Sequence, residues 1–223
     1  MTDWTIDTEV FDAIPIFPLK NAHLFPGAVL PLHIFEPRYV EMIEFVLDAG
    51  TNAIAIASLK ASRQVNGCGL PIVNPVMGAG LIFAAEKLEG GRWNVLIRGV
   101  SRIRMLEENE RTHLFRTIRA EIEEDIQAPL DHPLHGQLRS LLGQLADAAP
   151  EAKEVLNLIM SQGSCPASLT NLLGAHATSD PRMRQHMLNS VHVEERLRIA
   201  VKHIGRTLLE RLNPPENPTG TLH

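Results

Sequence analysis

Histidine and cysteine are the residues of this sequence whose chemistry could supply a metal site or a nucleophile. The chain has 223 residues, among them ten histidines and two cysteines. His132 and His135 are close, but Pro133 intervenes, and no His-Glu-x-x-His or Cys-x-x-Cys pattern completes a site. Cys68 lies between two glycines, and a catalytic thiol needs a partner base that the sequence does not place. We therefore expect no metal, no cofactor and no catalytic residue, and we interpret the two histidines as capping or surface residues.

Hydrolysis of peptides or nucleotides is the second chemistry to consider. The sequence lacks a Gly-x-x-x-x-Gly-Lys-Ser/Thr loop, the element that holds nucleotide phosphates on backbone N–H groups. A Ser–Lys dyad needs a serine beside a lysine of lowered pKa. The lysines before the last predicted helix belong to no such motif: Lys20, Lys60, Lys87 and Lys153. We predict a protein that is not an enzyme and that turns over neither protein nor ATP.

Nucleic-acid binding is the alternative function that the sequence leaves open. Arginines gather in one predicted hairpin, where Trp93 offers a ring for base stacking. Single-strand binders combine a basic groove with several stacking rings, whereas aromatic residues make up only 4% of this chain and the net charge is −5. Glutamates also flank the arginines, so composition argues against this alternative. The arginines are Arg92, Arg98, Arg102 and Arg104, and the glutamates are Glu86, Glu89, Glu107, Glu108 and Glu110.

The composition is that of a soluble globular protein of one or two domains. Hydrophobic residues account for 44% of the chain and charged residues for 21%. Two cysteines make no disulfide framework and fit a reducing compartment. No apolar run approaches the roughly 18 residues of a spanning helix, and the acidic start does not resemble a signal peptide. We expect a cytoplasmic protein without membrane contact.

The stretch 14–39 has the most specific pattern of the sequence and predicts two strands, the turn between them and the start of a helix. Two apolar runs, 14–19 and 29–35, are separated by Phe25-Pro26-Gly27, and the second alternates as a strand with one buried face does. Prolines within both runs indicate strand ends, bulges or an open sheet edge, because proline cannot donate to a ladder. Glu36-Pro37 then predicts a helix start, with proline at its first position.

These motifs resemble the N-terminal domain of Lon protease, in its small stand-alone bacterial form. The resemblance covers roughly residues 12–212 and implies an α+β fold. That fold is a PUA-like small β-barrel with one inserted helix, followed by a C-terminal helical bundle. It also implies binding of protein substrates or partners, because catalysis in Lon resides in other domains. PUA-like folds elsewhere bind RNA, so a PUA-like RNA-binding protein is the alternative. The motifs are Pro-Leu-Lys-Asn (18–21), Leu-Phe-Pro-Gly (24–27), Leu-Pro-Leu-His-Ile-Phe-Glu-Pro-Arg-Tyr (30–39), Gly80, Ile-Arg-Gly-Val-Ser-Arg (97–102) and Val-Glu-Glu-Arg-Leu (193–197).

The resemblance gives some motif residues structural roles. Arg102 is expected either to pair with Glu36, in the bidentate geometry that arginine favours, or to lie on a solvated strand face. Asn171 and His192 stand where the family commonly has an acidic residue, and we expect His192 to weaken the cap of the last helix. The motif residues with structural roles are Pro26, Gly27, Glu36, Pro37, Arg38, Gly99 and Arg102.

Periodicity divides the remainder of the sequence into two domains. A helix is predicted at 37–49, and glycines and prolines predict a long, functional or mobile loop at 60–78. Strands are predicted at 52–59, 79–88, 92–99, 100–107 and 114–124, with a Glu-Gly-Gly turn at 89–91. After the linker 127–133 the apolar spacing becomes helical: apolar stripes lie at 134–145 and 155–160, and further helices are indicated at Pro166, at Asp180-Pro181 and from Val193. The predicted units are a barrel at 10–126, a bundle at 130–212 and a disordered tail at 213–223.

Apolar residues near the turns are the candidates for binding a polypeptide. We expect the ligand to be an unfolded or extended polypeptide, or a partner protein, while the sequence does not indicate the oligomeric state. Strand addition at an open edge and a groove between barrel and bundle are the two routes considered. Core burial is the competing interpretation of each residue. The candidates are Leu24, Phe25, Phe35, Tyr39 and Trp93.

Overall fold

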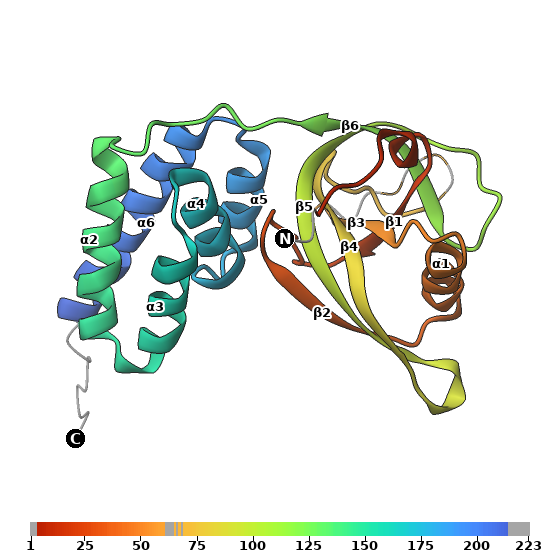
Figure 1. Ribbon diagram of the computed structural model, residues 1–223, viewed down its shortest axis with the longest axis horizontal. Helices are drawn as coiled ribbons and strands as arrows, with labels where there is room; N and C mark the ends of the chain where they lie inside the picture. The colour runs from red at the N-terminus through yellow and green to blue at the C-terminus, as the bar shows by residue number, and fades with distance from the viewer. Residues whose placement is uncertain (1–3, 61–64, 66, 68, 214–223) are drawn as a thin grey trace, which may run out of the picture.

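A mixed β-sheet and a helical bundle, joined by one extended segment, make up the molecule (Figure 1). The computed structural model describes residues 4–60, 65, 67 and 69–213. The predictions for Cys68, for residues 61–64 and 66 of the loop at 60–78, and for the tail from residue 214 fall outside these residues. The strands are β1 Ile14–Leu19, β2 Val29–Ile34, β3 Ala53–Ser58, β4 Val76–Lys87, β5 Trp93–Glu108 and β6 Arg116–Glu123. The α-helices are α1 Pro37–Asp48, α2 Pro133–Ala148, α3 Lys153–Gln162, α4 Pro166–His176, α5 Pro181–Asn189 and α6 Val193–Leu212.

Strand β5 is the centre of the sheet. The strand order is β2-β5-β4-β3-β1-β6, and β5 also pairs with β6, so five strands pair in a closed circuit and β2 is added outside β5. β1 and β3 are parallel, whereas the other pairs are antiparallel. The predicted α+β class is therefore confirmed.

Helix α1 follows β2 as the Glu-Pro motif predicts. Glu36 is the N-cap in extended conformation, and Pro37 occupies the first turn, where its missing donor costs nothing. The helix ends before Gly50, whose φ of +70° suits glycine. Its apolar face, which includes Met42 and Ile43, is buried against the sheet.

Strand β4 begins at Val76, earlier than the predicted start at residue 79. Glycine ordinarily weakens a strand, but Gly78 is required here because a Cβ would lie 1.8 Å from the carbonyl oxygen of Leu24. Gly99 on β5 meets the same constraint, because a Cβ added there would lie 2.1 Å from the carbonyl oxygen of Phe25. The two glycines let the segment between β1 and β2 lie flat against the sheet. β5 is also one continuous strand, where two were predicted.

Leu24 and Phe25, adjacent in the segment between β1 and β2, pack into different hydrophobic cores. Leu24 packs with α1 and the sheet, whereas Phe25 packs with bundle residues such as Leu172. The Phe25 ring fits because α4 has glycine at residue 174, where a Cβ would lie 2.7 Å from the ring. The two halves of the molecule are thus packed against each other at the start of β2.

The linker and helix starts of the bundle follow local sequence signals. His132 caps α2, its Nδ1 accepting a hydrogen bond from Leu134 N–H at 3.3 Å, and Asp180 caps α5 through Arg182 N–H at 2.9 Å. His192 precedes α6 without a side-chain cap bond, as predicted. Within the described residues, no helix is both long and apolar enough to cross a bilayer.

Candidate functional site

Strand β2 has one edge with which no other described strand pairs. Gly99 N–H donates to the Ala28 carbonyl at 2.8 Å, which makes Val29 and Arg98 a non-hydrogen-bonded pair in the β2–β5 ladder. The N–H groups of Val29 and His33 therefore point away from β5, and within the described residues they have no hydrogen-bond partner. Pro31 lies between them on the same edge and contributes only its carbonyl. β2 thus offers donors and acceptors to an added strand.

A hollow of about 560 Å³ lies over the outer face of β2, β5 and β4. Its floor is apolar: Leu96 is paired with Pro31 on one side and Ala84 on the other, and 37% of Leu96 is exposed. A polar row borders the floor, in which His33 Nδ1 and Asn94 Oδ1 are 2.8 Å apart.

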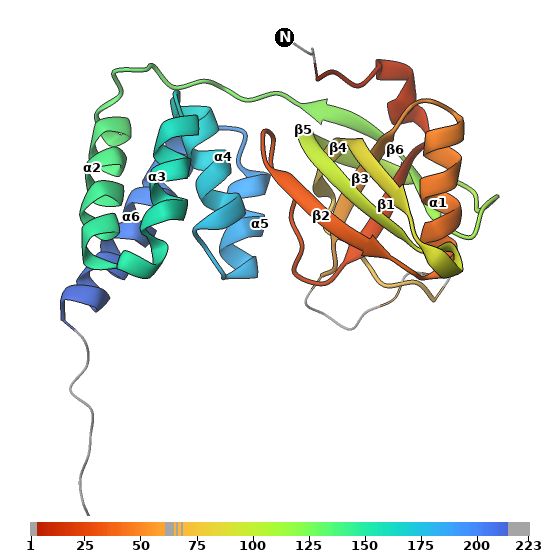
Figure 2. The ribbon, with the colours of Figure 1, turned by 60° about the horizontal axis from the view of Figure 1, so that its bottom comes forward.

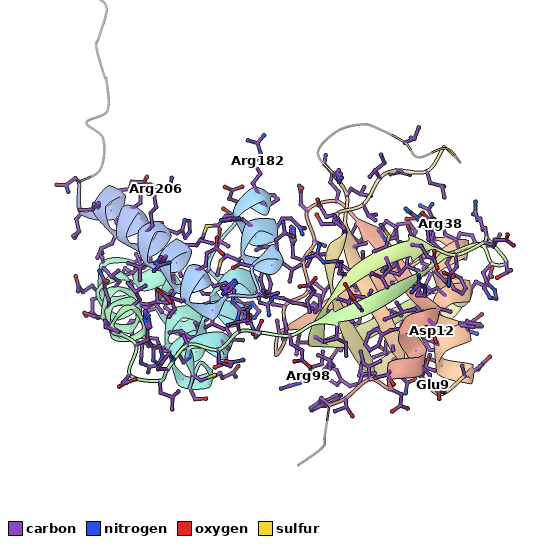
Figure 3. All side chains as sticks on the ribbon, turned by 90° about the horizontal axis from the view of Figure 1, so that it is seen from above. Glu9, Asp12, Arg38, Arg98, Arg182 and Arg206 are labelled. Carbon is purple, nitrogen blue, oxygen red and sulfur yellow. The ribbon has the colours of Figure 1, made fainter. Side chains whose placement is uncertain are left out.

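A second hollow, of about 630 Å³, continues along the same two strands toward the bundle. Val29 and Arg98 line it from the sheet, and Leu158 of α3 lines it from the bundle with 52% of its surface exposed. Figures 1 and 2 both show β2 at the margin of the sheet with its first residues toward the bundle, and Figure 3 places Arg98 at the boundary between the halves. We call the two hollows together the β2 groove, defined by Val29, Pro31, His33, Leu96, Arg98 and Leu158.

Two charged side chains of opposite sign, Glu86 and Arg98, line the two hollows of the β2 groove. Arg98 lies over the Trp4 ring, with its guanidinium carbon 5.3 Å from the ring centroid. His176 lines the bundle side, and burial, with Arg184 adding, lowers its pKa, so this imidazole is neutral near pH 7. The arrangement is suited to hydrogen bonding along the edge and apolar contact on the floor.

Comparison with known proteins gives the family. A family model for the ATP-dependent protease La (LON) substrate-binding domain matches residues 13–206. The chain belongs to this family. Similar curated proteins include the Lon protease of Desulfosudis oleivorans, 22% identical over 198 residues, which are 88% of this chain and 24% of that protein. The Lon protease of Roseiflexus castenholzii is 26% identical over 202 residues, 89% of this chain and 24% of its own length. The chain thus spans about a quarter of the length of these relatives.

Solved structures share the Lon N-terminal fold. A Lon N-terminal domain protein from Xanthomonas campestris superposes with a TM-score of 0.61 at 18% identity, covering 83% of this chain and 95% of that one. The N-terminal domain of the Mycobacterium avium complex Lon protease gives 0.65 at 16% identity, covering 87% and 98%. These structures show the fold, and the match of the family model to residues 13–206 confirms the resemblance to the Lon N-terminal family.

The candidate binding residues of this Lon-family chain do not gather at one place. Leu24 and Phe25 are buried in the two cores, and Tyr39 is buried beneath Arg38, whose guanidinium carbon is 4.6 Å from its ring centroid. Phe35 is 64% exposed just beyond β2, while Trp93, half-buried under Lys87, is paired with the last residue of β2. Of the five, only Phe35 lies beside the β2 groove, its ring centroid 6.1 Å from that of His33, because the Trp93 side chain packs with the core on the opposite face of the sheet.

Both expectations for Arg102 are wrong, because it neither pairs with Glu36 nor lies on a solvated strand face: only 2% of its surface is exposed. Glu36 accepts from Arg38 at 2.6 Å, whereas Arg102 points toward the bundle and donates to Asp125 at 2.9 Å and to Asn171. Asp125 also accepts from Arg196 of α6 at 2.6 Å. The pKa of Arg102 is lowered to about 9, mainly by burial and secondly by the positive charge of Arg196. The network joins sheet, linker and bundle.

The arginines considered for RNA binding are dispersed. Arg102 is buried, Arg104 pairs with Glu123, and Arg98 lies over Trp4, which leaves Arg92 on the hairpin donating to the carbonyl of Glu89. They therefore form no common basic surface. No group of three or more histidine, cysteine or acidic side chains in the described residues is placed to hold a metal ion.

Sequence analysis missed most residues of the β2 groove. A signal was present, because Val29, Pro31 and His33 form the alternate face of the predicted second strand. Leu96 and Arg98 continue that face across the ladder, but only the strand register reveals this. Leu158 belongs to a helix that reaches the groove through the fold alone.

Proposed function

We propose that this Lon-family chain is a non-catalytic polypeptide-binding module and that its β2 groove takes up an extended segment of the client. The unpaired edge of β2 beside the exposed apolar floor is the observation that supports this best. We infer further that the protein has two units, a PUA-like barrel at 10–126 and a bundle at 130–212, as the closed circuit of strand pairs supports. A reducing cytoplasm fits its two cysteines.

An added strand would pair with the outward groups of Val29 and His33. Main-chain hydrogen bonds of this kind supply affinity without sequence preference, and alternate side chains of the client supply selectivity. Every second client residue would stand on the same face of the sheet as Pro31 and Leu96 and extend the apolar floor, so aliphatic residues at alternate positions are preferred. Pro31 interrupts the edge, which limits strand addition between copies of the protein while leaving both neighbouring donors available.

Apolar contact should dominate the energy of the complex. The net charge of −5 provides no broad attraction to acidic ligands, so binding should change little with salt. Ordering a flexible client offsets part of the contact energy, which sets the dissociation constant at roughly micromolar or weaker.

The test is fluorescence polarisation with a short unstructured peptide of alternating valine and polar residues. Leu158→Asp should weaken binding about tenfold, because a charge would enter the apolar wall. Leu209→Asp, at an exposed leucine of α6 outside the groove, is the matched control and should bind as wild type does. Amide hydrogen exchange at Val29 and His33 should slow when the peptide is present.

Two results would contradict the proposal. One is peptide binding that leaves both β2 amides unprotected and is insensitive to Leu158→Asp. The other is tight, steeply salt-dependent binding of single-stranded RNA without peptide binding, since phosphate contacts weaken as salt rises.

A further inference from the structure

A separate cavity lies at the start of α1, on the side of the sheet remote from the bundle. It has a volume of about 100 Å³, and its wall includes Tyr39, Phe115 and Pro18. A water molecule takes up about 30 Å³, so the cavity has room for about three waters or for a group of similar total size. A short aliphatic side chain with one small polar group is of that size. Figure 3 shows Arg38, one of its lining residues, far from Arg98 and hence from the β2 groove.

Three arginines line this cavity: Arg38, Arg111 and Arg116. Arg38 is neutralised by Glu36 at 2.6 Å, and Arg116 by Glu108 through bonds of 2.7 and 2.8 Å.

Arg111 differs, because its guanidinium donates only to main-chain carbonyls, of His113 at 3.3 Å and Leu114 at 2.9 Å. Among the described residues, no carboxylate forms an ion pair with it. The two carbonyl bonds fix the guanidinium and leave donors free at the cavity. The wall therefore has one positive charge that these residues do not compensate.

We propose that this cavity binds an apolar group carrying a carboxylate, with Arg111 as the carboxylate donor and Tyr39 and Phe115 as the apolar wall. Arginine recognises a carboxylate through two parallel N–H bonds, and a charged acceptor gives the stronger hydrogen bond. The C-terminal residue of a polypeptide and a small free carboxylic acid share this chemistry. The site is independent of the β2 groove.

Tyr39 makes the site directly observable, because it is the single tyrosine of the protein. Protein labelled with 3-fluorotyrosine gives one ¹⁹F resonance, which reports on the cavity. We expect N-acetyl-leucine to shift it and N-acetyl-leucinamide, which lacks the charge, to bind about tenfold more weakly. The peptide Gly-Ser-Gly-Ala-Ala-Leu, with a free or amidated C-terminus, should behave as the same pair.

Variants assign the carboxylate to Arg111. Arg111→Ala should weaken binding of the free acid about tenfold without changing binding of the amide, and Arg111→Lys should restore part of it, since lysine retains the charge but not the fork. Arg92→Ala is the matched control, because Arg92 is also exposed and donates to a loop carbonyl at 3.3 Å. Thermal unfolding checks that each variant is folded.

The outcomes are distinct. Tighter binding of the free-acid peptide than of N-acetyl-leucine assigns the site to the carboxyl termini of polypeptides, and the reverse assigns it to small acids; either supports the proposal. Equal shifts by acid and amide, no shift by any probe, or undiminished acid binding by Arg111→Ala would overturn it. Leu158→Asp should leave the ¹⁹F response intact, so failure of the β2 groove and failure of this site are separable.

Discussion

At the residue scale, Asp125 is the most consequential single side chain of the fold. It accepts hydrogen bonds from Arg102 of the sheet and Arg196 of the bundle, and both arginines are almost fully buried. Two buried guanidiniums share one carboxylate, and Asn171 supplies only a neutral oxygen. The cluster depends on Asp125 for its only negative charge among these four residues.

We expect Asp125→Asn to destabilise the protein by about 3–5 kcal/mol, because removing one partner leaves buried charge uncompensated. Urea unfolding measures the change. Glu107→Gln breaks a solvent-exposed ion pair with Arg119 and serves as the control, with no measurable change expected. A loss for Asp125→Asn no greater than for the control would show that the network contributes little.

His23 makes stability depend on pH. It is buried before the Leu24–Phe25 segment, and burial, with Arg184 adding, lowers its pKa to about 4 from 6.5. The unfolded protein therefore binds a proton between pH 6.5 and 4 that the folded protein does not. Stability from the neutral ring is fully present above pH 6.5 and is lost as pH falls toward 4, by up to about 3 kcal/mol. Comparing His23→Gln with wild type across this range should show a flatter profile for the variant; identical slopes would contradict the assignment.

At the element scale, the contact between the Leu24–Phe25 segment and strand β4 depends on Gly78. We expect Gly78→Ala to cost roughly 3 kcal/mol, because the new methyl group meets backbone that cannot move aside. Gly143→Ala, in α2 with nothing within 4 Å of the added Cβ, should instead stabilise by up to about 1 kcal/mol. Chemical denaturation of both variants is the measurement, and equal effects would contradict the proposed close approach.

The elements that local chemistry specifies are those that sequence analysis predicted well. Pro37 and Gly50 bound α1, and α6 ends at Leu212, before Asn213, as its apolar spacing predicts. The early start of β4 was missed because Gly78 looks like a loop residue until its long-range neighbour is known. The predicted partner of Arg102 was wrong for the same reason, since the true partner, Asp125, lies next to it only because the bundle packs against the sheet. The floor of the β2 groove likewise requires the register of strands far apart in sequence.

At the scale of the whole molecule, Phe25 couples the sheet to the bundle. Its ring is fully buried among bundle residues, while its neighbour Leu24 is anchored in the sheet core. Phe25→Ala should cost about 3–5 kcal/mol and uncouple the unfolding of the two halves.

Two probes separate the halves in this measurement. Both tryptophans, Trp4 and Trp93, lie in the sheet half, whereas helical circular dichroism comes mainly from the bundle. The transitions should coincide in wild type and diverge in Phe25→Ala. Leu209→Ala, at an exposed position, is the control and should keep them coincident. Coincident transitions in Phe25→Ala would show that other contacts suffice.

Because β5 follows β2 late in the sequence, β2 must wait for its pairing partner during synthesis. His33 of β2 meets Asn94 of β5, which is 61 positions later in the sequence. At about 5–20 residues per second, a ribosome needs roughly 3–12 seconds to supply that partner. β1 waits longer for β6, its second neighbour in the sheet. During this interval β2 has no native strand partner and β1 has only β3, so both are open to capture by chaperones or other polypeptides. The translation rate across residues 35–92 therefore determines how long the emerging protein is vulnerable to misassembly.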